Sequence, residues 1–431
     1  MHVSDEGIMN RLLWAVIILV MAVGCSDVES PPLSVDNSHR QAPYSESDYY
    51  ASSVGDNLTA GNTRFAIKSF KKLDELEVEN TNIFFSPISL SIALTMAYNG
   101  AGGETYEAMK NTLEFQDMDL DEVNTQFLNL VRSLESFDDD VIIETANSAW
   151  IADYLQVRPD YIQRIVDYYL SEIHTVNFGA PETIDIINGW VEEQTNGRIE
   201  DLLVQIDPST LMMLINALYF SGSWKYRFDE SATESRPFHL PDGTVKDVLM
   251  MKDSGKDFRY YIHDDFTAAR MPYGRDVISM YVFLPDRDYS VDEFISNLNW
   301  EEWDTWMNSF DDLENLIQWA FYEQHEFRLP KFQCTYSKKL NDLLISLGMG
   351  IAFLPWADFS GIVDGSMYIE YVKQKAFIDV NEQGTEAAAA TVVVFLGEIG
   401  FTADRPFFFA IRDDRTGAIL FMGKIVDPEY E

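Results

Sequence analysis

Three segments of the chain are almost continuously apolar or β-branched, and they constrain the fold more than any other feature. They are residues 141–151, 211–220 and 277–284. Such runs are typical of strands whose two faces are both covered by other parts of the protein. Strands of this kind lie in the middle of a large sheet, so we expect at least one extensive, buried sheet.

Helical patterns alternate with these runs from about residue 57 onward, without an internal repeat. Ser86 and Pro87 predict the start of a helix that reaches Tyr98, because serine caps a first turn well and proline fits its first position. Further amphipathic helices are expected at 104–113, 121–136, 159–170, 183–196, 291–298 and 338–347. The pattern predicts one principal domain of mixed helices and strands.

The chain is strongly acidic: it has 71 Asp and Glu residues but only 31 Lys and Arg residues, and its formal net charge is −40. Such a surface repels nucleic acid and anionic polysaccharide. We therefore expect no nucleic-acid partner and no heparin binding. An acidic, solvated surface is the interpretation that this charge favours, since net charge bears on solubility and association more than on fold.

Residues 1–24 have the layout of a signal peptide, in which Arg11 precedes an apolar run too short to span a bilayer comfortably. The run ends at Cys25, and residues 22–25 resemble a lipobox, whose cysteine is lipidated. We predict a secreted protein anchored to the cell envelope through lipid on Cys25, with residues 25–56 as a flexible tether and 57–431 as the folded domain. The alternative is an ordinary cleaved signal with an incidental cysteine. The acidic residues near the N-terminus leave open whether translation starts at Met1 or Met9.

Motifs for catalysis are missing from the sequence. The six histidines are scattered, and there is no His-Glu-x-x-His, Cys-x-x-Cys or Gly-x-Ser-x-Gly motif and no glycine-rich phosphate loop. Cys25 and Cys334 lie in such different contexts that a disulfide between them is not expected, and Cys334 fits a small buried hydrophobe. We therefore expect no enzyme, no cofactor and no metal site.

The segment from Asn381 to Glu398 carries the clearest functional signal. Taken as a strand, it has one face of uncharged and mostly small side chains, namely Thr385, Ala387, Ala389, Thr391, Val393 and Phe395. Glu386 falls on the opposite face, no proline interrupts the run, and Gly384 supplies the backbone freedom to swing it in or out. The alanines favour a helix and the valines a strand, so the pattern alone leaves the two conformations open.

The run from Gly384 to Thr391 resembles the reactive-loop hinge of inhibitory serpins. Other motifs at family spacing extend the resemblance over nearly the whole chain from residue 57, at residues 82–89, 214–224, 329–332 and 403–424. The resemblance implies an α+β serpin fold with three β-sheets, eight to nine helices and an exposed reactive-centre loop at about 382–405. The hinge would comprise Glu382, Gly384, Thr385, Glu386, Ala387, Ala388, Ala389, Ala390 and Thr391.

The function that this resemblance implies is suicide-substrate inhibition of serine, or else cysteine, endopeptidases. In that mechanism the protease cuts the loop, and the loop inserts into the central sheet while the protease is still acyl-linked to it. We expect a monomer whose partner is the target endopeptidase and which touches the membrane only through its lipid. The alternatives are a non-inhibitory serpin that acts as a carrier or chaperone, and a lipid-anchored solute-binding protein of another fold.

Two further groups of residues match family positions. Ser86, Ser89 and Asn216 match the polar shutter beneath the sheet opening, where Gln374 replaces the usual histidine and puts the pH response of that histidine in doubt. Trp224, together with a pair between Lys331 and Glu382, matches the breach where insertion starts. For each of them, plain core packing or a weak surface ion pair is the alternative.

The family register, counted from Glu382, places the scissile bond between Glu398 and Ile399. Composition favours Phe395 or Leu396 instead, so a cut between Leu396 and Gly397 is the alternative. Glu398 is preferred because an earlier cut leaves a shorter inserted strand with fewer hydrogen bonds. Only seven residues, 399–405, separate Glu398 from Pro406, fewer than in most family members, and we expect this short distal side to hold the loop close to the body.

Overall fold

The computed structural model describes residues 45–430, except for 136–137, 171, 196, 198, 254–257, 311–325 and 385–399. The predicted signal peptide, Cys25, residues 385–391 of the hinge and both candidate scissile bonds therefore lie outside the described residues. Within the described part, no helix is both long enough and apolar enough to cross a membrane.

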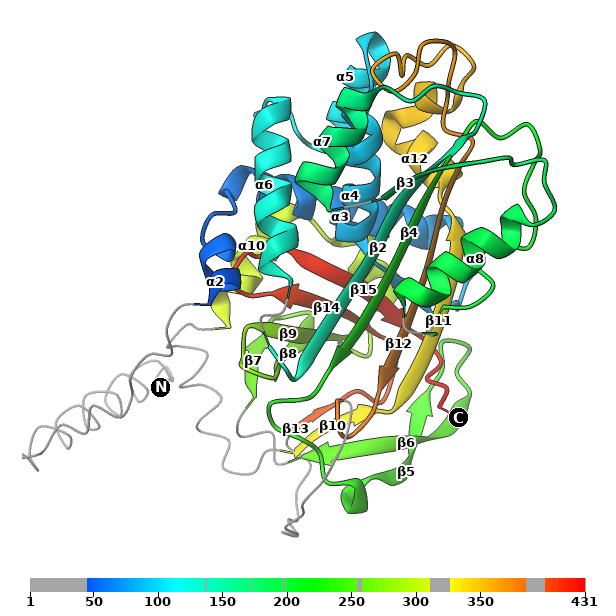
Figure 1. The fold of residues 1–431 in the computed structure, drawn as a ribbon. Helices are drawn as coiled ribbons and strands as arrows, with labels where there is room; N and C mark the ends of the chain where they lie inside the picture. Colours follow the sequence, from blue (N-terminus) through cyan, green and yellow to red (C-terminus); the bar gives the residue numbers. More distant parts are fainter. Residues whose placement is uncertain are drawn as a thin grey trace, which may run out of the picture. The chain divides into compact units, whose positions relative to one another are not determined.

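Three β-sheets organise the chain (Figure 1). The sheet that matters for function, called the central sheet here, has the strand order β11 (Phe332–Lys339), β12 (Tyr371–Val380), β4 (Met212–Gly222), β2 (Val141–Ala152) and β3 (Glu172–Val176). The six-stranded sheet has the order β1 (Ile83–Phe85), β15 (Ile419–Ile425), β14 (Phe407–Asp413), β9 (Ile278–Pro285), β8 (Phe266–Tyr273) and β7 (Arg259–Ile262). The four-stranded sheet has the order β13 (Gly400–Thr402), β10 (Glu326–Pro330), β6 (Val245–Asp253) and β5 (Glu234–His239).

The three apolar runs form interior strands, as predicted: they become β2, β4 and β9. The two faces of the central sheet pack into separate apolar cores. Ile151 and Leu214 belong to the larger core, whereas their neighbours Trp150 and Met213 point the other way into a second core that Ile187 of helix α8 helps to form. Alternate residues of β2 and β4 are thus buried on opposite faces, which explains their continuously apolar sequences.

The described residues contain ten α-helices, slightly more than the eight to nine expected. They are α2 (Glu46–Ala51), α3 (Asp56–Leu76), α4 (Pro87–Tyr98), α5 (Gly103–Thr112), α6 (Leu120–Ser133), α7 (Pro159–Tyr169), α8 (Thr183–Gln194), α9 (Val291–Asn297), α10 (Trp300–Ser309) and α12 (Asn341–Leu344). The predicted helix after Ser86 is confirmed as α4, whose N-cap is Ser86. All of α4 is buried, because it contacts β2 and β4 of the central sheet as well as β15 of the six-stranded sheet.

Two expectations about element boundaries differ from the structure. The helix predicted at 338–347 begins only at Asn341, because β11 stays paired with β12 up to Lys339. Residues 46–51, placed in the flexible tether, form α2, whose Ser45 and Asp48 make a reciprocal capping box. Asp48 also forms an ion pair with Arg415 at 3.3 Å. These contacts give residues 46–51, which lie within the predicted tether, a defined helical structure.

Cys334 lies on β11 and is buried. Burial raises the pKa of its thiol to about 12, so the thiolate is disfavoured at neutral pH. The residue behaves as the small buried hydrophobe that its sequence context indicated.

Candidate functional site

The candidate site is built around the line along which β4 and β12 pair, called the joint from here on. The two strands run parallel. Their ladder extends from the pair Tyr371–Met213 to the pair Phe377–Tyr219, while both strands continue for three more residues, to Val380 and Gly222. A segment that follows β12 through a tight turn runs antiparallel to it. Placed in this joint, such a segment would be antiparallel to both neighbours and could form a full ladder on each side.

The turn after β12 closes the open end of this joint. Trp224, just after β4, donates its indole Nε1–H to the Asn381 carbonyl at 2.9 Å and its backbone N–H to the Gln383 carbonyl at 3.2 Å. The Trp224 ring is buried and stacks on Tyr273 with 4.2 Å between ring centroids. The segment after β4 and the turn after β12 are thereby held together at the position matched to the breach.

Glu382 lies at the centre of this turn and is only 5% exposed. Its carboxylate accepts a hydrogen bond from Thr233 Oγ1 at 2.6 Å and forms an ion pair with Lys331 Nζ at 2.7 Å. Burial alone would raise the pKa of Glu382, but the hydrogen bonds from Lys331 and Thr233 outweigh burial and lower it below its ordinary value. Burial would likewise lower the pKa of Lys331, yet the bond to Glu382 raises it. Both partners are therefore charged at neutral pH.

Gly384 ends the described part of the turn, with φ at +70°. A Cβ atom at this position would overlap the backbone N of Trp224 and the carbonyl oxygen of Gly222. The turn approaches the end of β4 so closely that only glycine fits. The structure thus brings Glu382 and Gly384 of the predicted hinge against the breach residues Trp224 and Lys331.

The residues matched to the shutter lie beneath the middle of the joint. Gln374 on β12 and Ser86 exchange two hydrogen bonds of 2.9 Å, one from the Ser86 N–H to Gln374 Oε1 and one from Gln374 Nε2 to the Ser86 carbonyl. The Ser86 hydroxyl donates to the Leu420 carbonyl at 2.8 Å and accepts from the Ser89 N–H at 3.4 Å. All of these side chains are buried, so β12 is tied to the start of α4 by neutral hydrogen bonds.

Asn216 lies on β4 directly opposite Gln374 in the ladder, which places its backbone at the shutter. Two residues that contact the breach, Thr233 and Tyr273, were missed by the sequence analysis. Asn381 begins the segment that the sequence analysis singled out, but it was given no role there. Thr233 is 149 positions from its partner Glu382, and no local sequence signal points to such a contact.

The comparisons with known proteins agree with this arrangement. A family model described as Serpin (serine protease inhibitor) matches residues 60–428. An uncharacterized serpin-like protein of Thermococcus kodakarensis is 36% identical, over 97% of this chain and 99% of its own. The leukocyte elastase inhibitor of Sus scrofa is 34% identical, over 86% of this chain and 99% of its own.

Solved structures share the fold as well. Human glycosylated kallistatin has a TM-score of 0.79 at 27% identity and covers 88% of this chain and all of its own. The thermophilic serpin tengpin, in its native state, has a TM-score of 0.75 at 30% identity and covers 87% of this chain and 95% of its own. The three sheets, the parallel joint and these matches define a serpin-type protein. The chain belongs to the serpin family.

Proposed function

We propose that this serpin traps serine endopeptidases by inserting its cleaved reactive loop between β4 and β12. The observation that carries the proposal is the parallel joint, whose ladder stops three residues short of the strand ends, at the turn that leads into the loop. An inserted strand would gain hydrogen bonds on both sides. The similarity to a leukocyte elastase inhibitor supports the same function.

The length of the loop supports this proposal. The residues from Thr385 to Glu398 number fourteen and, extended, would span about 46 Å at about 3.3 Å per residue. β12 has ten residues, or about 33 Å on the same rule. The segment is long enough to pair along the whole of β12, whether the chain is cut after Glu398 or after Leu396.

Within this mechanism, the breach and the shutter act as two closures on one joint. The contacts of Glu382 and Trp224 must be rearranged for the first loop residues to enter the sheet. The Gln374–Ser86 bonds hold β12 on α4, so they resist the sideways movement that makes room for a new strand. Both closures favour the uncleaved, five-stranded state.

The substitution Thr385→Arg tests insertion directly. A strand that enters at Gly384 would bury residue 385, and a buried, unpaired guanidinium is costly. We expect the variant to be cleaved as a substrate and to form no denaturant-resistant complex with a protease that the native chain traps. Glu386→Arg is the matched control, since strand alternation places it on the opposite face. Stable complexes with Thr385→Arg would disprove insertion, whereas a carrier would trap no protease even as the native chain.

The bond between Glu398 and Ile399 is the scissile bond that we propose. β13 starts at Gly400, which pairs with Glu326 of β10, and its next residue, Phe401, is 2% exposed. A cut at this bond leaves one residue before the strand, so docking of a protease must loosen β13, whereas a cut after Leu396 leaves three. Mass spectrometry of the fragment released from a trapped complex distinguishes the two bonds. A new N-terminus at Ile399 supports the proposal, and one at Gly397 rejects it.

We also propose that the protein is secreted and held at the cell envelope by lipid on Cys25, which would place the inhibitor where extracytoplasmic proteases act. The proposal rests on the lipobox-like residues 22–25. In a fractionation experiment, Cys25→Ala should move the protein from the membrane fraction to the soluble one. A variant that stays with the membrane would contradict lipid anchoring.

A further inference from the structure

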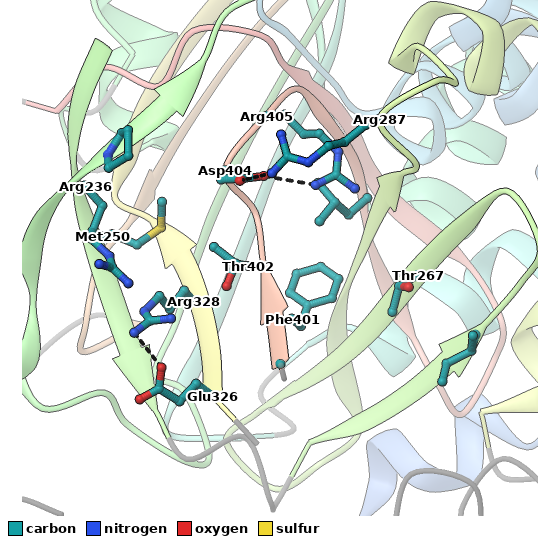
Figure 2. Close-up of a pocket in the computed structure, with 14 residues that line it drawn as sticks. Arg236, Met250, Thr267, Arg287, Glu326, Arg328, Phe401, Thr402, Asp404 and Arg405 are labelled. Atoms are coloured by element: carbon teal, nitrogen blue, oxygen red, sulfur yellow. Dashed lines mark hydrogen bonds and ion pairs between the residues drawn. The ribbon is translucent and has the colours of Figure 1, made fainter. Parts of the chain in front are cut away.

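A cavity of about 530 Å³ lies where β13 and β10 of the four-stranded sheet meet β8 and β9 of the six-stranded sheet (Figure 2). Its lining includes four arginines and two carboxylates: Arg236, Arg287, Arg328, Arg405, Glu326 and Asp404. The lining is therefore net positive, although the whole chain carries a formal charge of −40. A cavity lined by charges of one sign has a strengthened electrostatic field inside it, and here the positive lining favours an anionic ligand.

The two carboxylates in the lining are each shared between two cations. Asp404 binds Arg287 at 2.6 Å and Arg405 at 3.0 Å. Glu326 binds Arg328 at 2.5 Å and also Lys252 at 2.6 Å. Arg236 pairs with Glu234, outside the lining, at 3.3 Å. The five cations Arg236, Lys252, Arg287, Arg328 and Arg405 thus share three carboxylates, so a positive excess remains.

Arg328 provides the most specific observation. Its side chain comes from β10, the whole residue is 9% exposed, and its Nε–H has no hydrogen-bond partner among the described residues. A buried donor without an acceptor costs about 1–3 kcal/mol, and most such groups in folded proteins are satisfied. In Figure 2, Arg328 and Arg236 lie on one side of β13, and Arg287 lies with Arg405 beside Asp404. An acceptor group in the cavity would satisfy the Arg328 donor.

We propose that this cavity binds a small organic anion with a carboxylate or phosphate group and an apolar body. The anionic group would accept hydrogen bonds from Arg328 and Arg236, since guanidinium groups bind such oxygens with strong, charge-assisted bonds. The apolar body would contact Pro237 and Ile262, which also line the cavity and are not buried. The volume falls within the range of about 300–1,000 Å³ that is usual for small-molecule sites.

The size of the ligand follows from the charge distribution. A long polyanion would extend beyond the cavity over the acidic surface of the chain and be repelled there. A small anion inside the cavity is separated from most of those charges by more than the Debye length of about 8 Å at physiological salt, so their repulsion is largely screened. The site is therefore compatible with the expectation that heparin does not bind.

The cavity also borders β13, because Gly400, Phe401 and Thr402 are part of its lining. Among the described strands, β13 lies at the edge of this sheet and pairs with β10 alone. A ligand that bonds Arg328 of β10 and contacts Thr402, its partly exposed partner on β13, would hold β13 against its neighbour. Binding should therefore slow amide hydrogen exchange in residues 400–403, whereas an anion held loosely on the surface would leave that exchange unchanged.

The test uses the full-length protein and three probes: inorganic phosphate, citrate and dodecanoate. We expect saturable binding of at least one probe in calorimetry at about 150 mM salt, where the acidic surface is screened, together with slower exchange in residues 400–403. Tight binding of dodecanoate alone would identify a lipid-like carboxylate, and binding of phosphate would identify the phosphate class. No saturable binding of any probe up to 10 mM would overturn the proposal.

Two variants locate the site. Arg328→Met should weaken binding at least tenfold, and Arg236→Gln, at a more exposed position, provides the same test if the first variant fails to fold. Arg158→Gln is the matched control for Arg236→Gln, because Arg158 forms an exposed ion pair with Asp364 at 2.6 Å and is not among the residues that line the cavity. Affinity that is unchanged in both cavity variants, or reduced equally in the control, would also overturn the proposal.

Discussion

The proposed shutter and the proposed breach hold the same pair of strands, β4 and β12, by different chemistry. At the shutter, Gln374 and Ser86 exchange neutral hydrogen bonds in a fully buried position. At the breach, the buried carboxylate of Glu382 forms an ion pair with the half-buried Lys331 and accepts a hydrogen bond from the half-buried Thr233. Hydrogen bonds between neutral groups are insensitive to salt and pH, whereas an ion pair responds to both.

This difference implies that solution conditions should act on the two closures separately. The family usually has a histidine at the position of Gln374, so in this chain the titratable group has been removed from the shutter. Acid sensitivity of the joint should then originate at its open end, where the loop enters, and not beneath its middle. The following experiments measure the free energy of opening the joint, from hydrogen exchange of the β12 amides.

The substitution Gln374→Leu should have the largest effect. It leaves the buried Ser86 N–H without this acceptor, which costs about 1–3 kcal/mol, and it removes one of the two bonds to the Ser86 carbonyl, which keeps the bond from the Leu90 N–H at 3.3 Å. We expect the opening free energy to fall by about 3 kcal/mol, at low and high salt alike. Gln163→Leu, which removes an exposed hydrogen bond to Asp167 on α7, is the control. An effect of Gln374→Leu no larger than that of the control would mean that the shutter bonds do not hold β12.

The substitution Lys331→Met should have a smaller effect that depends on conditions. It leaves Glu382 buried with Thr233 as its remaining side-chain donor, and we expect a loss of about 2 kcal/mol, within the range for charged hydrogen bonds. Lys72→Met is the control, because Lys72 pairs with Glu75 at an exposed site of α3 where such pairs contribute little. A loss that persists unchanged at pH values where Glu382 is protonated would show that Lys331 acts through packing, for example against the Tyr430 ring at 4.2 Å.

Sequence reasoning predicted what local patterns encode. The apolar runs predicted β2, β4 and β9 correctly, because a strand buried on both faces has a continuously apolar sequence. Ser86 and Pro87 predicted the start of α4 correctly, because helix caps have characteristic residues. The resemblance located Gln374 and Ser86 in advance, but not the two reciprocal bonds between them. The helix expected from 338 was wrong at its start because pairing of β11 with β12, a long-range interaction, decides where the strand ends.

The parts that the sequence could not predict depend on contacts between distant segments. Thr233 reaches Glu382 from the loop before β5, and the charge reversal around Arg328 arises only where two sheets meet. A net charge of −40 does not indicate a cationic cavity, since the net charge of a sequence does not tell where its charged residues lie in the folded protein.

The pH dependence of the breach is the smallest expected effect, and it separates the two closures most directly. The folded-state pKa of Glu382 lies below its ordinary value of 4.5, so the closed breach holds fewer protons than the open one. Its contribution to closure is therefore fully present above about pH 4.5 and is lost as the pH falls through the lowered pKa. Lys331 has a raised pKa, so its contribution is present below its ordinary value of 10.5 and is lost only as the pH rises through the raised one.

Other carboxylates also titrate in acid, so the informative quantity is the opening free energy of the native chain minus that of Glu382→Gln. This difference should be constant between about pH 6 and 9 and should shrink on acidification below pH 4.5. The pH-dependent change in this difference cannot exceed the contribution of the ion pair itself. We therefore expect it to be smaller than the effect of Lys331→Met. In Gln374→Leu, the opening free energy should fall as steeply with decreasing pH as it does in the native chain, because the shutter bonds join neutral groups. A fall with decreasing pH that disappears in Gln374→Leu but survives in Glu382→Gln would reverse the assignment of the two closures.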